Sequence, residues 1–153
     1  MKSRLGLNRR SFGALTLAAL PSRASAAAPS SLQLAHFSRD VARCLEAQVV
    51  GIDLEDVKTV FDGITAPVLG VGVGSGAQRG KQALAAALEG FHRLGPFSLT
   101  IVYVPARRWR LADYRDVCRG VCAVADPAGL TIFGVLHDEH VPSGTMRVAV
   151  LTG

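Results

Sequence analysis

The sequence is poor in cysteine and in charge, and it has no apolar segment long enough to cross a membrane. Its 153 residues include three cysteines, Cys44, Cys118 and Cys122, which are too few and too unevenly spaced for a disulfide scaffold. We expect them to be small core residues. Charged residues make up 19% of the chain. Its apolar run at 12–20 is shorter than the roughly 20 residues of a bilayer-spanning helix, so no stable membrane span is predicted.

The basic excess of the chain lies in its first 26 residues. The chain has 17 Lys and Arg against 12 Asp and Glu, for a net charge of +5. Five basic residues and no acidic one precede Ala27, which leaves 12 of each sign in the body. Proteins that bind nucleic acid or an anionic membrane surface concentrate Lys and Arg on one face. The neutral body therefore argues against both, and we expect a protein partner and no nucleic acid.

Residues 1–26 have the layout of an export signal. Basic residues come first, the apolar run follows, and small residues close the segment. The candidate twin-arginine motif is Arg9, Arg10 and Phe12, and the candidate cleavage residues are Ala24 and Ala26. This pattern predicts a twin-arginine-like signal and a periplasmic location. A cytoplasmic protein with a basic tail is the alternative.

The rest of the chain is expected to be a short linker followed by one domain. Residues 27–37 begin with Ala-Ala-Pro-Ser-Ser and are predicted to be the linker, and 38–153 the domain. Helices are predicted over 38–50, 53–61, 77–93 and 111–125, and strands over 66–76, 97–104, 130–136 and 146–151. This order indicates an α+β two-layer sandwich, in which helices pack mainly on one face of a four-stranded mixed sheet.

Glycine alternates with valine in the first predicted strand. Gly70, Gly72 and Gly74 would share one face of it, and glycine within a strand indicates that another segment packs very close. A phosphate-binding loop fits poorly, because Gln82 follows Lys81 where a Walker A loop has Ser or Thr. The glycines are interpreted as structural. The cluster at 137–140 lacks a third metal ligand nearby in the sequence, and no metal site is predicted.

Four stretches resemble the C-terminal domain of the FtsZ family of the tubulin/FtsZ proteins, in the order in which that family has them. They are Gly51-Ile52-Asp53-Leu54-Glu55-Asp56-Val57-Lys58-Thr59-Val60, the glycine strand with its following helix at 70–79, Ile132-Phe133-Gly134 with Asp138-Glu139, and the final strand at 147–153. The predicted helix at 38–50 is similar to the end of the family's central helix. The resemblance implies the fold of the family's C-terminal domain.

The resemblance also implies a role for two acidic residues. FtsZ-like and tubulin-like proteins bind GTP in an N-terminal domain, and an acidic loop of the next subunit reaches that site and positions the attacking water. On this sequence that loop carries Asp53 and Asp56, which would act only in trans. Gly51 stands where the family has Asn. The alternative is that both carboxylates simply cap the helix that begins there.

These implications favour a non-enzymatic module. The family's GTP-binding half has no counterpart in this sequence, so no cofactor is expected, and GTP would come only from a partner subunit. We expect a stand-alone, exported assembly module that binds a protein partner, FtsZ or another copy of itself, through Gly51, Asp53 and Asp56. The alternative is a cytoplasmic, cell-division-related domain that docks on FtsZ and caps filaments or stimulates GTP hydrolysis in trans.

Overall fold

A computed structural model describes residues 28–47, 50 and 52–153. The predicted signal and cleavage residues Arg9, Arg10, Phe12, Ala24 and Ala26 lie outside the described residues, and so does Gly51. The elements, in chain order, are α1 (Ser31–Ala47), α2 (Leu54–Gly63), β1 (Val68–Ser75), the 3-10 turn η1 (Gly76–Gln78), α3 (Arg79–Ala87), β2 (Phe97–Val104), α4 (Leu111–Val124), β3 (Leu130–His137) and β4 (Thr145–Thr152).

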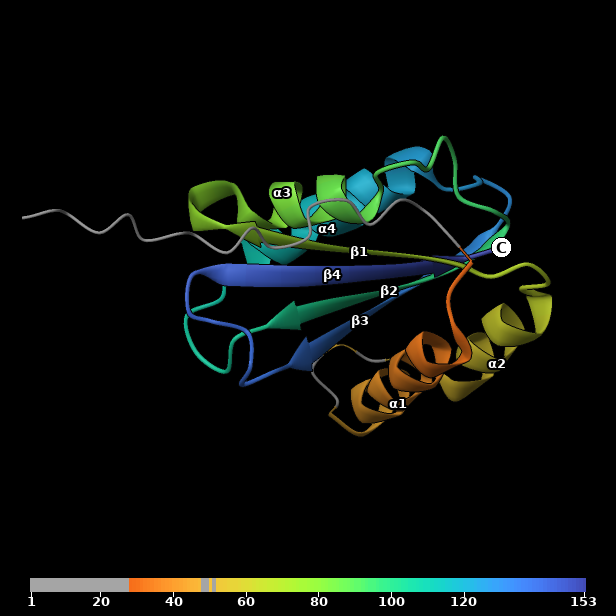
Figure 1. Cartoon of the computed structure of the whole chain (residues 1–153), viewed down its shortest axis with the longest axis horizontal. Helices are drawn as coiled ribbons and strands as arrows, with labels where there is room; N and C mark the ends of the chain where they lie inside the picture. Colours follow the sequence, from red (N-terminus) through yellow and green to blue (C-terminus); the bar gives the residue numbers. More distant parts are fainter. Residues whose placement is uncertain (1–27, 48–49, 51) are drawn as a thin grey trace, which may run out of the picture.

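The four strands form one mixed sheet, which confirms the predicted α+β fold. Their order is β1-β4-β2-β3, so that β4 is antiparallel to both β1 and β2, while β3 runs parallel to β2. The chain crosses from β2 to β3 through α4, as a parallel pair requires. Strands β1 and β3 are the two edges of the sheet (Figure 1).

The helices cover both faces of the sheet. The sequence had predicted that they would lie mainly on one face. Helices α3 and α4 lie on one face, and α1 and α2 lie on the other (Figure 1). Strand β2 is buried from Ser98 to Val104, with Leu99, Ile101 and Tyr103 in the α1–α2 core and Val102 and Val104 in the α3–α4 core. Polar and apolar residues alternate in the first half of β2, but Ser98 and Thr100 are buried as well, so neither face of this strand is open to solvent.

Helix α1 begins seven residues earlier than predicted. Ser30 accepts a hydrogen bond from the Gln33 backbone N–H at 3.2 Å, and the Gln33 side chain accepts one from the Ser30 N–H at 2.8 Å. This reciprocal pair is a capping box, and it starts the helix at Ser31 instead of at Ser38. Residues 31–37, predicted as linker, are therefore helical, and Phe37 is buried in the core.

The glycine face of β1 is closed by α3, as the sequence predicted. A methyl group at Gly70, Gly72 or Gly74 would meet the backbone of α3, at Ala87, Ala83 and Arg79 respectively. Helix α3 ends at Ala87, six residues short of the prediction, and the chain then turns through Gly90, whose φ is +87°.

The cysteines do not share one environment. Cys44 is buried on α1, whereas Cys122 is exposed on α4, so the expectation of three core cysteines fails at Cys122. Helical spacing does not identify which face of α4 meets the sheet, and Val117 and Val121 occupy that face.

Candidate functional site

The acidic pair lies at the start of α2. Asp53 is the N-cap of this helix, and its Oδ1 accepts a hydrogen bond from the Glu55 backbone N–H at 2.8 Å. Asp56 is exposed in the first turn, where a negative charge is favoured by the helix dipole. Asp53 therefore does cap the helix, which was one of the two roles left open by the sequence. Its second carboxylate oxygen accepts no hydrogen bond from the described residues.

The two carboxylates border a cavity of about 230 Å³ at the β3 edge of the sheet. Side chains from four parts of the fold line it: Val50, Ile52, Asp53, Asp56, Tyr114, Ile132 and Phe133. The structure thus brings the predicted acidic residues beside an aromatic and aliphatic surface contributed by β3 and α4. This apolar part of the site was not expected from the sequence, because Asp53 and Phe133 are 80 positions apart.

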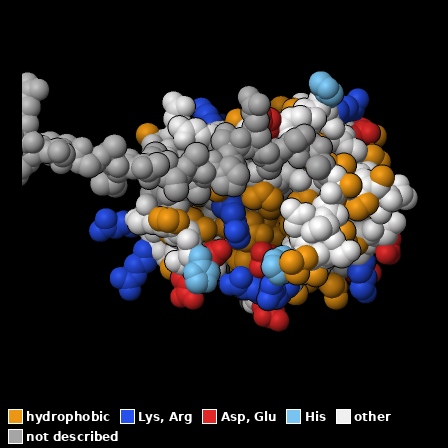
Figure 2. Space-filling model, in the orientation of Figure 1, with side chains coloured by type: hydrophobic (Ala, Val, Ile, Leu, Met, Phe, Trp, Pro, Cys, Tyr) orange, Lys and Arg blue, Asp and Glu red, His pale blue; other side chains and the backbone are white. Residues whose placement is uncertain are grey.

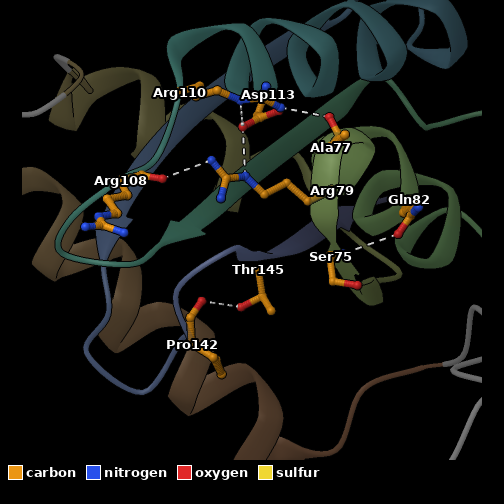
Figure 3. A network of polar contacts seen from close by, with 9 residues as sticks. All are labelled: Ser75, Ala77, Arg79, Gln82, Arg108, Arg110, Asp113, Pro142 and Thr145. Atoms are coloured by element: carbon orange, nitrogen blue, oxygen red, sulfur yellow. Dashed lines mark hydrogen bonds and ion pairs between the residues drawn. The ribbon is translucent and has the colours of Figure 1, made fainter.

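A buried ion pair fixes the end of α4 that carries Tyr114. The Arg79 Nε donates to Asp113 Oδ2 at 2.8 Å, and these residues are only 5% and 2% exposed (Figure 3). Arg110 holds the same carboxylate from outside, with its Nη2 2.7 Å from Oδ1. The second nitrogen of Arg79, Nη2, donates to the Arg108 carbonyl oxygen at 3.1 Å. The first turn of α4 is therefore tied to α3 and to the loop that precedes it.

The charge of Asp113 is stabilised by these two arginines. Burial favours the neutral carboxyl, but the hydrogen bonds and charges of Arg110 and Arg79 outweigh it and hold the pKa of Asp113 below its usual range. Arg108 has a φ of +64°, in the left-handed region that non-glycine residues rarely adopt, and its carbonyl is the one that Arg79 binds. This network is structural, since neither buried group faces the cavity.

Chemically, the site around Asp53 and Asp56 is equipped for binding. Carboxylates accept hydrogen bonds and attract cations, and the apolar lining can bury a hydrophobic side chain of a partner. Within the described residues, no histidine, cysteine or lysine lines this cavity beside the two acids. A mixed acidic and aromatic surface of this kind suits a protein contact.

A second cluster, which sequence reasoning missed, lies between α1 and the sheet. It borders a cavity of about 440 Å³, and Figure 2 shows this face, where hydrophobic side chains floor a hollow and charged side chains and histidines surround it. The Tyr103 hydroxyl donates to Asp40 Oδ2 at 2.8 Å, and the Arg147 guanidinium lies over the Tyr103 ring, 3.8 Å from its centroid. Arg147 also binds Asp138 at 3.3 Å. Burial and the bond to Asp40 both raise the pKa of Tyr103.

One signal in the sequence could have indicated this cluster. Arg147 interrupts an otherwise apolar final strand, and a charged residue in a buried strand needs a partner. The partners, however, come from three other elements, and their meeting depends on the strand order. The cluster is therefore a result of topology and not of a local motif.

Two further features of the described part of the chain bear on function. Among residues 28–47, 50 and 52–153, no group of three or more His, Cys, Asp or Glu residues could hold a metal ion. Asp138 instead accepts the His140 backbone N–H at 2.9 Å and pairs with Arg147. None of the described helices combines the length and the apolar character that a membrane span requires.

Comparison with known proteins finds similarity at the level of structure. The sequence matches no protein-family model and no curated protein. The structure resembles an empty FtsZ dimer from M. jannaschii with a TM-score of 0.62 and 23% identity, over 82% of this chain and 40% of the FtsZ chain. A tryptophan-to-tyrosine mutant of M. jannaschii FtsZ matches with a TM-score of 0.61 and 25% identity, over 82% and 42%. The chain thus spans about two-fifths of the length of these structures, and its fold is that of the FtsZ C-terminal domain.

Proposed function

We propose that this chain is a non-enzymatic protein-binding module that uses the FtsZ C-terminal fold for assembly with a cell-division-related partner. The proposal rests on one observation: Asp53 and Asp56 border an apolar cavity at the open β3 edge. Tyr114 and Phe133 supply aromatic surface there, and aromatic residues are enriched where proteins bind one another. The acidic rim would select a partner with basic or hydrogen-bond-donating groups.

Two contacts that hold parts of the site in place support this proposal. Asp53 is held by its cap, and the first turn of α4 is held by the Arg79–Asp113 pair. A preorganised surface loses little conformational entropy when it binds, which favours recognition. A hydrolytic role for this chain alone has no comparable support, since the cavity residues are two carboxylates, a tyrosine and four aliphatic or aromatic side chains.

The binding proposal is tested with two defined partners, a second copy of the chain and FtsZ. Sedimentation of the full chain, alone and with FtsZ, should reveal a complex. Asp56→Lys should weaken it at least about tenfold, because charge reversal at an interface centre opposes association. Glu89→Lys is the matched control, since Glu89 is exposed on a different part of the surface. Equal weakening by both variants, or no complex with either partner, would refute the acidic surface as the binding site.

Export is a separate part of the proposal. The motif Arg9-Arg10-Ser11-Phe12 and the small residues up to Ala26 favour a twin-arginine-like signal and a periplasmic mature protein. Fractionation of cells combined with mass spectrometry of the N-terminus should find a periplasmic chain that begins at Ala27. Replacing Arg9 and Arg10 by Lys should retain the chain in the cytoplasm. An uncleaved protein in the cytoplasm of wild-type cells would exclude export.

A second candidate function is docking on FtsZ in the cytoplasm, which the similarity in fold favours. In that case the chain caps filaments or supplies Asp53 and Asp56 to a GTP site of FtsZ. Adding the protein to polymerising FtsZ with GTP should change polymer mass or phosphate release. Asp53→Ala and Asp56→Ala distinguish docking from catalysis, since only loss of phosphate release with retained binding indicates a chemical role. Unchanged polymer mass and turnover would exclude this candidate.

A further inference from the structure

The cavity between α1 and the sheet has the size and the lining of a small-molecule site. It measures about 440 Å³, and such sites usually enclose roughly 300–1,000 Å³, with a mostly apolar lining and a few convergent polar groups. Leu69 and Val71 of β1 and Ala149 of β4 form its apolar floor, and Phe37 borders it from α1. Val71 is 37% exposed, so part of this floor is open to solvent. An apolar group placed in the hollow would therefore remove hydrophobic surface from water.

The guanidinium of Arg147 is held in place at the wall of this cavity. It lies over the Tyr103 ring, 3.8 Å from the ring centroid, and its Nη2 is 3.3 Å from Asp138 Oδ2. The Tyr103 hydroxyl is itself bound to Asp40 Oδ2 at 2.8 Å. Contacts from α1, from β2 and from the segment after β3 thus position the guanidinium before any ligand is present. A preorganised group of this kind loses little conformational entropy when it binds.

This guanidinium has donors to spare. Arginine carries five N–H donors and no acceptor. Nη2 of Arg147 donates to Asp138, whereas Nε is buried and has no hydrogen-bond partner among the described residues. Nη1 also bonds to no described residue, and unlike Nε it is not enclosed, since the side chain is 37% exposed. Nη1 is therefore available to an acceptor in the cavity, and an anionic acceptor forms the stronger hydrogen bond.

The uncompensated charge around the cavity is positive. Its two carboxylates are already paired, Asp40 with Arg43 at 3.4 Å and Asp138 with Arg147 at 3.3 Å. Three further side chains with N–H groups line the cavity and form no ion pair with a described residue: His36, Arg39 and His140. With both histidines neutral, the charge of Arg39 remains uncompensated. The lining therefore favours a ligand with one negative charge.

We propose that this cavity binds a small amphipathic carboxylate. The carboxylate accepts a hydrogen bond from Arg147 Nη1 and is attracted by Arg39, while the apolar body of the ligand lies on the apolar floor. A single negative charge balances the one uncompensated arginine, whereas the dianion of a phosphate ester would leave one negative charge over. The cavity shares no lining residue with the one that Asp53 and Asp56 border, so this site is separate from the proposed protein contact.

Titration of the full chain with octanoate, followed by calorimetry and NMR, tests the proposal. Octanoate should bind saturably and shift the amide signals of Val71 and Ala149, and it should leave those of Tyr114 and Phe133 at the acidic cavity unchanged. Octan-1-ol and octylammonium have the same apolar chain. Both should bind at least about tenfold more weakly, because the first lacks the negative charge and the second reverses it.

Two variants locate the carboxylate. Arg39→Glu should weaken octanoate binding about fivefold or more, since repulsion replaces attraction at an exposed position. Arg119→Glu is the matched control, because it makes the same change of charge at an exposed position of α4, on the opposite face of the sheet, and it should leave the affinity unchanged. Arg147→Lys keeps a charge beside Asp138 but removes the guanidinium fork, and it should also weaken binding about fivefold or more.

Several results would overturn the proposal. Octanoate that does not bind saturably, or that shifts only signals outside this cavity, would exclude the site. Equal affinities for octanoate and octan-1-ol would show that the hollow binds apolar groups alone. Equal losses in Arg39→Glu and Arg119→Glu would show that only the overall charge of the protein matters. Tighter binding of octyl phosphate than of octanoate would refute the assignment to a carboxylate.

Discussion

At the scale of single residues, the carboxylate of Asp113 compensates a positive charge in the core. It neutralises Arg79, which is 5% exposed and has no other carboxylate partner among the described residues. Asp113→Ala should lower the free energy of unfolding by about 3–5 kcal/mol, because removing one partner leaves a buried charge unpaired. Urea denaturation measures this loss. A variant that no longer folds at 25 °C also agrees with it.

Two companions to this variant separate charge from packing. Asp116→Ala, on the same helix, removes a carboxylate that has no ion pair among the described residues and should cost about 0.5 kcal/mol or less. Arg79→Met with Asp113→Leu removes both charges and should recover part of the stability lost in Asp113→Ala. Similar losses in Asp113→Ala and Asp116→Ala would contradict the role assigned to the buried pair.

The same carboxylate makes stability depend on pH. Arg110 and Arg79 hold the pKa of Asp113 below its usual range despite its burial, so the folded state favours the ionised form. The resulting stabilisation is complete above the unfolded pKa of about 3.9 and is lost as the pH falls through the lower folded value. A ¹³C NMR titration of the Asp113 carboxyl should give a midpoint below about 3.9. A midpoint above that value would mean that the folded state favours the neutral carboxyl, and the pH dependence of stability would then have the opposite sign.

At the scale of elements, the packing of α3 on β1 depends on the glycine face of the strand. A methyl group at Gly72 would meet the carbonyl oxygen of Ala83 and the amide nitrogen of Ala87, which are backbone atoms that cannot move alone. Gly72→Ala should therefore lower the free energy of unfolding by about 1–3 kcal/mol. Val73→Ala, on the exposed face of the same strand, should cost less. Thermal or urea unfolding measures the stability loss in both variants. Equal losses would mean that α3 is free to shift.

The elements themselves were largely predictable from local patterns. Strand β2 has the predicted bounds, and α4 ends one residue before its predicted end. The start of α1 was also encoded, in Ser30 and Gln33, but the prediction began the helix at residue 38 because the apolar spacing is clearer after that position. The early end of α3 was missed because apolar residues continue to Phe91, while Gly90 already turns the chain.

The candidate site was predictable only in its acidic part. Asp53 and Asp56 belong to one local stretch, which made both the cap and the resemblance visible. Tyr114 and Phe133 reach the same cavity from α4 and β3, and that meeting depends on the strand order β1-β4-β2-β3. The distribution of helices over the two faces also depends on the topology. Spacing along the chain does not encode these relations, so a single sequence indicates them poorly.

At the scale of the whole molecule, the two faces of the sheet are held unequally. The α3–α4 face is closed over β1 by backbone contact at the glycines and includes the buried ion pair. On the other face, α1 buries Phe37, Val41 and Cys44 and α2 buries Val57 and Val60, and the hydrogen bond between Asp40 and Tyr103 joins α1 to the sheet. A helix held to the sheet mainly by side-chain contacts, without a close backbone approach of this kind, opens at a lower free energy than the core strands.

Helix α1 should therefore open before the sheet unfolds. Native-state hydrogen exchange at low urea concentrations should give a lower opening free energy for Ser31–Ala47 than for β2. Phe37→Ala removes a side chain that is 3% exposed and should lower stability by about 3–5 kcal/mol, with α1 amides affected first. Leu32→Ala, at a position that is 65% exposed, should change it by about 0.5 kcal/mol or less. If α1 amides exchange only through global unfolding, the two faces form one cooperative unit and the unequal coupling inferred from the packing is wrong.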